Sequence, residues 1–133
     1  MSAITHLRVG AAVAVLTVNS AFAFDINAYR RAHGLPPVHR SAPLASAAHS
    51  HALDMAQRNH LDHDGFVGRM SPLSSAAAEN VAYGCATEDC AFKMWANSPG
   101  HRRNMLMREV TRYGIASAIA ANGRRYWVLE LGN

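Results

Sequence analysis

Residues 95–106 read WANSPGHRRNML, and this segment contains the most informative histidine of the chain. Ser98 is a residue type preferred at helix N-caps, and Pro99 is preferred at the first helical position. His101 is therefore predicted at the third position of a helix, where the positive end of the helix dipole disfavours its protonation. A neutral imidazole can bind a metal or accept a proton. The spacing alone also fits a structural histidine that caps the turn or packs under Trp95.

Two segments upstream supply further candidate groups. The loop NHLDHDG places His60 and His63 three residues apart, which is not a defined metal-ligand spacing. The segment AAAEN places Glu79 before an apolar strand, where a carboxylate is poorly solvated unless it has a partner. A glutamate and two histidines can hold Zn²⁺ with an open coordination position. The alternative is a hydrogen-bonded carboxylate that orders the loop, and the residues leave both interpretations open.

The rest of the sequence predicts helices on both sides of a small antiparallel sheet, which is an α+β sandwich. The helix that starts at Ser41 carries an apolar stripe, and His51 lies over that stripe, so His51 is predicted to face the interior. His49 and His60 are predicted at the surface. The expected elements are helices over residues 25–33, 41–60 and 87–98, a loop over 61–77, and strands over 79–84, 111–120 and 124–131, the last two joined by an Asn-Gly hairpin turn.

The amino-terminal segment, residues 1–23, is predicted to be a secretory signal peptide. It has an apolar run from Val9 to Val18 and ends in Ala21-Phe22-Ala23, the small-x-small pattern that signal peptidases accept. The apolar run is shorter than the roughly 20 residues that a membrane-spanning helix needs, and an uncleaved anchor is the alternative. Cleavage after Ala23 leaves residues 24–133 as one small periplasmic or secreted domain without a further membrane segment.

The chain has a modest positive charge, which gives little support to nucleic-acid binding. It contains 13 basic and nine acidic residues, for a net charge of +4 with neutral histidines. Removal of the signal peptide takes away one basic residue, Arg8, and no acidic one, so an excess of three positive charges remains. The arginines are scattered or paired along the sequence and do not form a basic run.

The two cysteines, Cys85 and Cys90, lie close together in GCATEDC. In an exported protein they meet an oxidising compartment, so a local structural disulfide is predicted. The alternatives are a redox pair, which usually has the CxxC spacing, and half of a zinc site, for which the chain has no second cysteine pair. Because the closed loop is so short, we expect a stabilisation below the roughly 3 kcal/mol of a 15-residue loop.

Five segments occur in an order that is typical of a known superfamily. They are SHALDMAQRNHLDHDG, AENVAYG, MWANSPGHRRNML, YGIASA and RYWVLELG. The sequence resembles the CAP superfamily of cysteine-rich secretory proteins, antigen 5 and plant pathogenesis-related proteins, and most of all its short bacterial SCP-like extracellular members. The resemblance covers essentially all of residues 24–133, and the pairing of AEN with W-x-x-SPGHR-x-NML is specific. It implies an α–β–α sandwich with a central cleft.

The resemblance also implies which residues line this cleft. In the wider family two histidines and two acidic residues line it and can hold a divalent cation such as zinc. Their counterparts by motif are His63, Glu79 and His101. Eukaryotic members have a glutamate three residues after the tryptophan, where this chain has Ser98, so three of the four groups remain. Asn80 is predicted to support the cleft by bonding the loop or by orienting a histidine.

Three functions fit these residues. The preferred one is an exported binding or interaction module that is not an enzyme, whose cleft holds a divalent metal, a small ligand (lipid, glycan or peptide) or a protein partner. No GxSxG or HExxH motif supplies a catalytic centre. The first alternative is a metal-dependent, peptidase-like hydrolase with Glu79 as general base. The second is a structural His–Glu–His network with the function on another surface. Trp95 matches the family's tryptophan and is expected in the core.

Overall fold

The computed structural model describes residues 23–133. The predicted signal peptide therefore lies outside the described residues, except for its last residue, Ala23. Within residues 23–133, no helix is long and apolar enough to cross a membrane. The helices are α1 (Ile26–Ala32), α2 (Ala42–Arg58), α3 (Phe66–Met70), α4 (Glu88–Ala96) and α5 (Pro99–Met105); the strands are β1 (His39–Arg40), β2 (Ala77–Tyr83), β3 (Arg112–Ile119) and β4 (Arg125–Gly132).

The four strands form one sheet in the order β1-β3-β4-β2, so β2 is an edge strand. The antiparallel β3–β4 hairpin occupies the centre, and β2 pairs with β4 in antiparallel register. The prediction of a purely antiparallel sheet is wrong at the opposite edge, because β1 pairs parallel with β3 through His39 and Arg112. A two-residue strand has no alternating pattern from which its pairing could be predicted.

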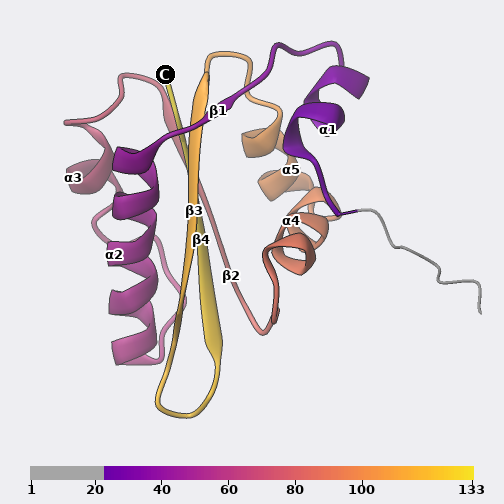
Figure 1. The fold of residues 1–133 in the computed structure, drawn as a ribbon. Coiled ribbons are helices and arrows are strands. Elements are labelled where there is room, and N and C mark those ends of the chain that lie inside the picture. Colours follow the sequence, from indigo (N-terminus) through magenta and orange to yellow (C-terminus); the bar gives the residue numbers. More distant parts are fainter. Residues whose placement is uncertain (1–22) are drawn as a thin grey trace, which may run out of the picture.

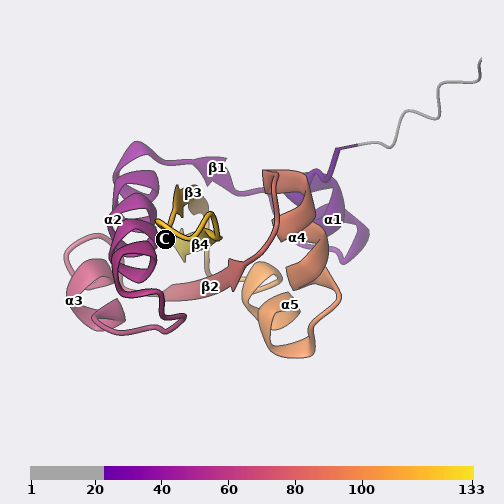
Figure 2. The ribbon, with the colours of Figure 1, turned by 90° about the horizontal axis from the view of Figure 1, so that it is seen from below.

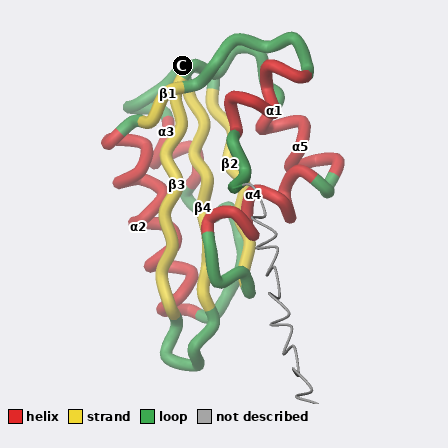
Figure 3. The backbone as a smooth tube through the Cα atoms, turned by 45° about the vertical axis from the view of Figure 1, so that its right-hand side comes forward, coloured by secondary structure: helices red, strands yellow, loops and turns green. Residues whose placement is uncertain are grey.

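The sheet lies between two helical layers (Figures 1 and 2). Helices α2 and α3 cover one face, and α1, α4 and α5 cover the other, which confirms the predicted α–β–α sandwich. Figure 3 shows the two long central strands between these layers and the short β1 at the edge of the sheet. We call the α2–α3 side the small-residue face and the α1–α4–α5 side the aromatic face.

The aromatic face contains the larger hydrophobic core. Trp95 is fully buried in it, and the indole Nε1 donates a hydrogen bond of 3.1 Å to the Val81 carbonyl of β2. Phe92 meets Trp95 edge to face, with ring centroids 5.9 Å apart. Trp127 of β4 donates its Nε1–H to the Cys85 carbonyl at 2.8 Å. Each buried indole therefore satisfies its polar atom on backbone, which such a side chain requires.

The small-residue face is packed by a close approach of backbone to backbone. Ala48 and Ala52 of α2 are fully buried against the sheet. Gly114 of β3 lies so close to α2 that a Cβ atom at this position would stand 2.0 Å from the Ala45 nitrogen and 2.3 Å from the Leu44 carbonyl carbon. Only glycine fits here, because no side chain can shift to accommodate backbone atoms.

A buried arginine ties α1 to the end of α5. Arg30 is fully buried, and its Nη1 donates to the carbonyls of Met105 and Met107, each at 2.9 Å. Its Nε donates to the Pro36 carbonyl at 2.9 Å. Burial, followed by the positive charge of Arg108, lowers the pKa of Arg30 from its ordinary value. The bonds to Met105 and Met107 supply partners to carbonyls at and just after the end of α5, where intrahelical donors are absent.

Two sequence-based predictions concern the connections around β2. The Cys85–Cys90 disulfide is present and pins the turn between β2 and α4, which confirms that prediction. The prediction of a loop over residues 61–77 is wrong in part, because the segment contains the short helix α3. Its glycine-rich sequence hides the helix: Gly65 occupies the N-cap position without a side-chain bond, and Gly68 lies inside the helix. Helix propensity is low at glycine.

Candidate functional site

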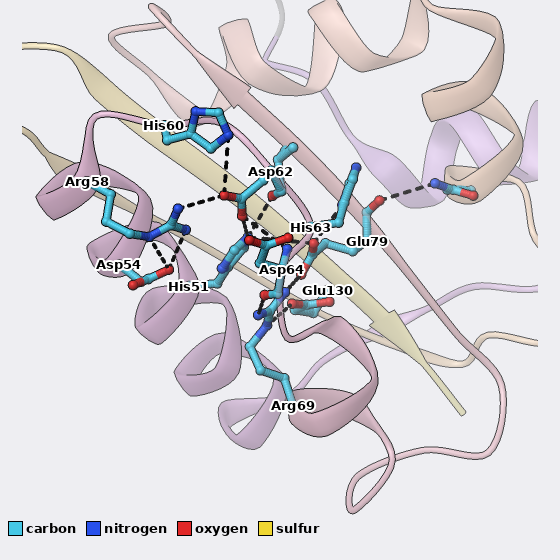
Figure 4. Close-up of polar contacts among 12 residues, drawn as sticks. His51, Asp54, Arg58, His60, Asp62, His63, Asp64, Arg69, Glu79 and Glu130 are labelled. Carbon is cyan, nitrogen blue, oxygen red and sulfur yellow. Dashed lines mark hydrogen bonds and ion pairs between the residues drawn. The ribbon is translucent and has the colours of Figure 1, made fainter.

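Glu79 of β2 stands at the centre of a polar cluster on the small-residue face (Figure 4). Its Oε1 accepts a hydrogen bond of 2.7 Å from Nδ1 of His63. Its Oε2 accepts one of 2.5 Å from Nη2 of Arg69, which reaches in from α3. The Nε2 of His51 lies 3.8 Å from Oε1. The carboxylate is only 2% exposed, so these cationic and donor groups replace the water that it has lost.

The environment of Glu79 favours its ionised form. Burial alone would raise the pKa of this carboxyl group. Contact with Glu130 and the hydrogen bonds from Arg69 and His63 outweigh burial and hold the pKa below its ordinary value. Glu79 is therefore a carboxylate at neutral pH, and both of its oxygens already have protein partners.

Glu130 is the cross-strand neighbour of Glu79 on β4. It is fully buried, and neither carboxyl oxygen has a hydrogen-bond partner among the described residues. The Nε atom of Arg69 lies 3.5 Å from Oε1. Burial, and then the neighbouring Glu79, raise the pKa of Glu130 to about 10. Glu130 is therefore protonated at neutral pH, and the pair carries one negative charge opposite the Arg69 guanidinium.

His51 extends the cluster toward α2. It is buried, as its position on the α2 stripe predicts, and its Nε2 donates to the Asp62 carbonyl oxygen at 2.8 Å. Arg58 holds the same loop by bonding Asp62 at 2.8 Å and Asp54 at 2.6 Å. The loop that carries His63 is thus fastened to α2 by its preceding residues. His49 and His60 are exposed and take no part in the contacts of Glu79.

On the other side of β2, His101 lies at the third position of α5, as predicted. Ser98 occupies the N-cap position, but its side chain makes no hydrogen bond to the helix backbone. Its Oγ instead lies 3.0 Å from Nδ1 of His101. The predicted N-cap position of Ser98 is therefore confirmed, but its side chain bonds His101 and not the helix backbone. The hydroxyl orients the imidazole, because ring and hydroxyl lie one helical turn apart and bond each other.

The pKa of His101 is lowered, as expected, but for a different reason. Burial is the main cause, and the positive charge of His63 is the second. The two imidazoles approach the edge strand β2 from different sides of the sheet, since His63 bonds Glu79 and His101 belongs to α5.

Asn80 fastens α5 to β2. It is fully buried, and its Nδ2 donates to the His101 carbonyl at 3.0 Å. Its Oδ1 accepts from Nδ2 of Asn104 at 2.8 Å. Asn104 Nδ2 also lies 3.3 Å from the Glu79 carbonyl oxygen. The side chains of Glu79 and Asn80 therefore point to opposite faces of the sheet, and each positions one of the two candidate histidines.

An open cleft of about 260 Å³ runs along the edge of β2 beside these residues. Its walls combine polar groups with small or aromatic apolar ones: His63, Phe66, Ala77, Ala78, Glu79 and Asn104. The sequence-based candidates His63 and Glu79 meet directly at this cleft, and His101 lies across the strand. Arg69 and Glu130 were missed, because Arg69 lies in the predicted loop and Glu130 in an apolar strand.

The described residues do not gather a closed metal centre. Within residues 23–133, no group of three or more His, Cys, Asp or Glu side chains is arranged to hold a metal ion. Glu79 is committed to His63 and Arg69. The two candidate histidines both use Nδ1 for a protein contact, and neither Nε2 makes a hydrogen bond within this part of the chain. Among the described residues, the Nε2 atom of His63 is thus left without a protein partner at the cleft, and that of His101 across the strand β2.

A mixed sheet between two helical layers, with histidines and a glutamate at its edge strand, defines the class of SCP-domain sandwiches. The chain belongs to the cysteine-rich secretory protein (CAP) family, whose model matches residues 24–131. Among curated proteins it is 32% identical over 97 residues to the uncharacterized protein YkwD of Bacillus subtilis, a match that covers 67% of this chain and 38% of YkwD. The chain thus spans well under half of that relative.

Solved structures share the fold. An extracellular protein from Bacillus anthracis that contains an SCP domain is similar with a TM-score of 0.71 and 25% identity, over 81% of this chain and 37% of that one. An outer surface protein of Borrelia burgdorferi is similar with the same TM-score and 17% identity, over 81% of this chain and 86% of that one. At this lower identity the likeness to the Borrelia protein shows the fold alone.

Proposed function

We propose that the protein is an exported binding module whose cleft along β2 takes a small ligand, with His63 and His101 able to hold a divalent cation such as Zn²⁺. The observation that carries this proposal is the way both imidazoles are held. His63 is fixed through Nδ1 by Glu79 at 2.7 Å, and His101 through Nδ1 by Ser98 at 3.0 Å. In both rings the remaining nitrogen, Nε2, is left for a ligand.

This arrangement is typical of metal-binding histidines. Such residues usually donate the second ring N–H to a carboxylate or another acceptor, which fixes the tautomer and the ring orientation. The Glu79 carboxylate leaves Nε2 of His63 with its lone pair, and a donation from His101 Nδ1 to the Ser98 hydroxyl does the same for His101. Glu79 is accordingly a positioning residue, because Arg69 occupies its second oxygen. A bound cation would supply an anchoring point for an anionic or carbonyl group of the ligand.

The chain supplies two of the four positions that Zn²⁺ prefers, so the remaining positions fall to water or to the ligand. A site of this kind binds more weakly than a closed structural zinc centre. The volume of the cleft, about 260 Å³, lies just below the range of about 300–1,000 Å³ that is usual for ligand pockets. Its apolar wall of Phe66, Ala77 and Ala78 suits a short acyl, glycan or peptide segment with one polar end.

The geometry supports binding better than hydrolysis. A general base needs a lone pair directed at the substrate and a pKa near the working pH. Glu79 has both oxygens bonded within the protein, and its pKa lies below the ordinary value. The same contacts also order the loop before α3, so the structural role proposed for this network is compatible with binding.

Export is part of the proposal. It is supported by the amino-terminal signal sequence, by a disulfide that needs an oxidising compartment, and by membership of a family of secretory proteins. The cleft therefore meets the periplasm or the medium outside the cell, where Zn²⁺ and fragments of the cell envelope are available to it.

Calorimetric titration with Zn²⁺ tests the cation site. We expect His63→Ala and His101→Ala each to weaken Zn²⁺ binding by about tenfold or more, since each removes one of two protein ligands. Ser98→Ala is expected to weaken it less, near the lower end of the roughly tenfold to hundredfold range of a supporting contact. His49→Ala, an exposed histidine on α2, is the matched control and is expected to leave the affinity unchanged. Equal affinity in all four variants, or no binding by the parent protein, contradicts the proposal.

A further inference from the structure

Phe24, near the start of the described residues, is held in place by both its backbone N–H and its ring. The backbone N–H of Phe24 donates to Oδ1 of Asp89 in the first turn of α4. The Phe24 ring stacks on Phe92 with centroids 5.2 Å apart and planes inclined by 11°. It also contacts Tyr29 of α1 at 5.4 Å. Ala23, immediately before it, is exposed. The predicted signal peptide therefore ends, and the contacts of the folded domain begin, at the Ala23–Phe24 peptide bond.

We propose that hydrolysis of the Ala23–Phe24 bond creates an α-ammonium group on Phe24, and that this group forms an ion pair with Asp89. The mature amino terminus would then be held in the folded domain by this ion pair. The reaction needs water and the signal peptidase of the exporting cell. The hydroxyl of water joins the carbonyl carbon of Ala23, the C–N bond breaks, and the Phe24 nitrogen leaves with the proton. An α-amino group has a pKa of about 8, so the new terminus is mostly a cation at neutral pH.

The surroundings of Asp89 suit such a cation. Lys93, one helical turn away, contacts Oδ2 at 2.8 Å and leaves Oδ1 to Phe24. The contact with Lys93, and then the N–H of Phe24, lower the pKa of Asp89, so it is ionised. A groove of about 410 Å³ at this terminus is also lined by Asp25 and Glu88. The acidic residues here, Asp25, Glu88 and Asp89, outnumber the two basic ones, Arg40 and Lys93, by one.

The contacts of the Phe24 ring and of the Phe24 nitrogen together select the Ala23–Phe24 bond as the cleavage site. Asp25 is already engaged as the N-cap of α1, where it accepts from the backbone of Asn27 and Ala28. A cut one residue later would remove the stacked Phe24 ring, and a cut earlier would place the charge on a residue that does not contact Asp89. This inference goes beyond the proposed cleft function and rests only on its export component.

The position of the cut is tested first. The full chain is expressed in a bacterium that exports it, and the protein recovered outside the cytoplasm is analysed by intact mass and amino-terminal sequencing. We expect a protein that begins with Phe24. Exported protein that retains Ala23 or begins at any other residue overturns the inference. Zn²⁺ titration of the same sample is independent of this result, so failure of one proposal does not imply failure of the other.

Docking of the charge is tested on that processed protein. Lys93 is the only lysine of the chain, so Lys93→Arg leaves the Phe24 α-amine as the only amine and allows its selective acetylation. Acetylation removes the charge but keeps an N–H donor. We expect it to lower Tm by about 2–4 °C, in keeping with the loss of a partly exposed ion pair in a domain of this size. With Asp89→Asn added, acetylation is expected to change Tm by less than about 1 °C.

An equal shift in both backgrounds overturns the docking on Asp89. The comparison stays informative even if Asp89→Asn is less stable by itself, because only the effect of acetylation within each background is compared. Asp54→Asn is the control background, since Asp54 is also an exposed carboxylate paired with a basic residue one turn away on its helix. In that background we expect the full shift of about 2–4 °C.

Discussion

The two faces of the sheet are buried by different means. On the aromatic face, bulky rings fill the space between the strands and three helices, and the polar atoms of the indoles bond backbone carbonyls. On the small-residue face, alanines and one glycine let α2 approach β3 until backbone nearly meets backbone. The small-residue face also holds the buried ionisable pair Glu79 and Glu130, whereas the aromatic face has no buried carboxylate among the described residues.

The aromatic face mainly stabilises the fold, whereas the small-residue face positions the polar groups of the candidate site. Rings on the aromatic face remove much apolar area from water, and this stabilises the fold. At Gly114 the close approach of α2 leaves no room for a side chain. On the same face the buried Glu79 carboxylate is bonded by Arg69 of α3 and by His63 of the preceding loop. The candidate cleft then opens at the edge strand, where the two faces meet.

The largest effect is expected from removing the central ring of the aromatic face. Trp95→Ala leaves a cavity and an unpaired carbonyl at Val81, and we expect a loss of about 4 kcal/mol in the free energy of unfolding. Urea denaturation followed by circular dichroism measures it. Met94→Ala, an exposed neighbour on the same helix, is the control and is expected to change stability by less than about 0.5 kcal/mol. Similar losses in both variants would contradict the role given to this face.

A smaller but still large effect is expected from adding one methyl group to the other face. Gly114→Ala places Cβ against the backbone of Ala45 and Leu44, so α2 must move away from β3. We expect a loss of about 3 kcal/mol in the same denaturation measurement. Gly68→Ala, where the added Cβ meets nothing within 4 Å, is the control and is expected to be neutral or slightly stabilising. If Gly114→Ala changes stability no more than Gly68→Ala does, the small-residue face is not packed too closely to accept an added methyl group.

The third prediction concerns the buried pair of Glu79 and Glu130. Here we expect a substitution to increase the free energy of unfolding. The pKa of Glu130 rises from an ordinary value of 4.5 to about 10 on folding, so the folded protein takes up a proton at this group. The stability that this group contributes at low pH is therefore lost as the pH rises from about 4.5 to about 10. Glu130→Gln keeps the shape of the neutral acid without this proton uptake.

We expect Glu130→Gln to be more stable than the parent by about 2 kcal/mol at pH 7, by less at pH 5 and by more at pH 9. Urea denaturation at the three pH values measures the difference. Glu79 makes a contribution of the opposite sign, which is lost as the pH falls through its lowered pKa, below the three pH values of this comparison. Parallel pH dependence in parent and variant would show that Glu130 ionises normally. A buried carboxyl group with a raised pKa would then no longer distinguish the small-residue face from the aromatic face.

Most of the fold could be predicted because its elements carry local signals. The alanine and leucine stripe marks α2 over residues 41–60, and the structure has it over Ala42–Arg58. The Asn122-Gly123 turn marks the hairpin, with Gly123 at a positive φ of 85°. The pairing of β1 could not be predicted, because its partner Arg112 lies far along the chain and two residues carry no periodicity.

The site could be predicted only where a motif or a helix position fixed it. His63, Glu79 and His101 came from a family pattern, and the structure places them around one edge strand. Glu130 could not be recognised by burial pattern, because β4 is buried on both faces and its apolar run does not alternate. Arg69 could not be recognised either, since its role depends on a short helix that the glycines around it obscure.

The strand order has a consequence for how this chain can fold as it is made. The two central strands, β3 and β4, are formed by the last residues of the chain, 112–132, while β1 and β2 pair only with them. A ribosome or an export channel releases the amino-terminal end first, so α1, β1, α2 and β2 emerge with no sheet to join. The sheet therefore cannot assemble before residues 112–132 are available, which makes sheet formation a late step that depends on long-range contacts.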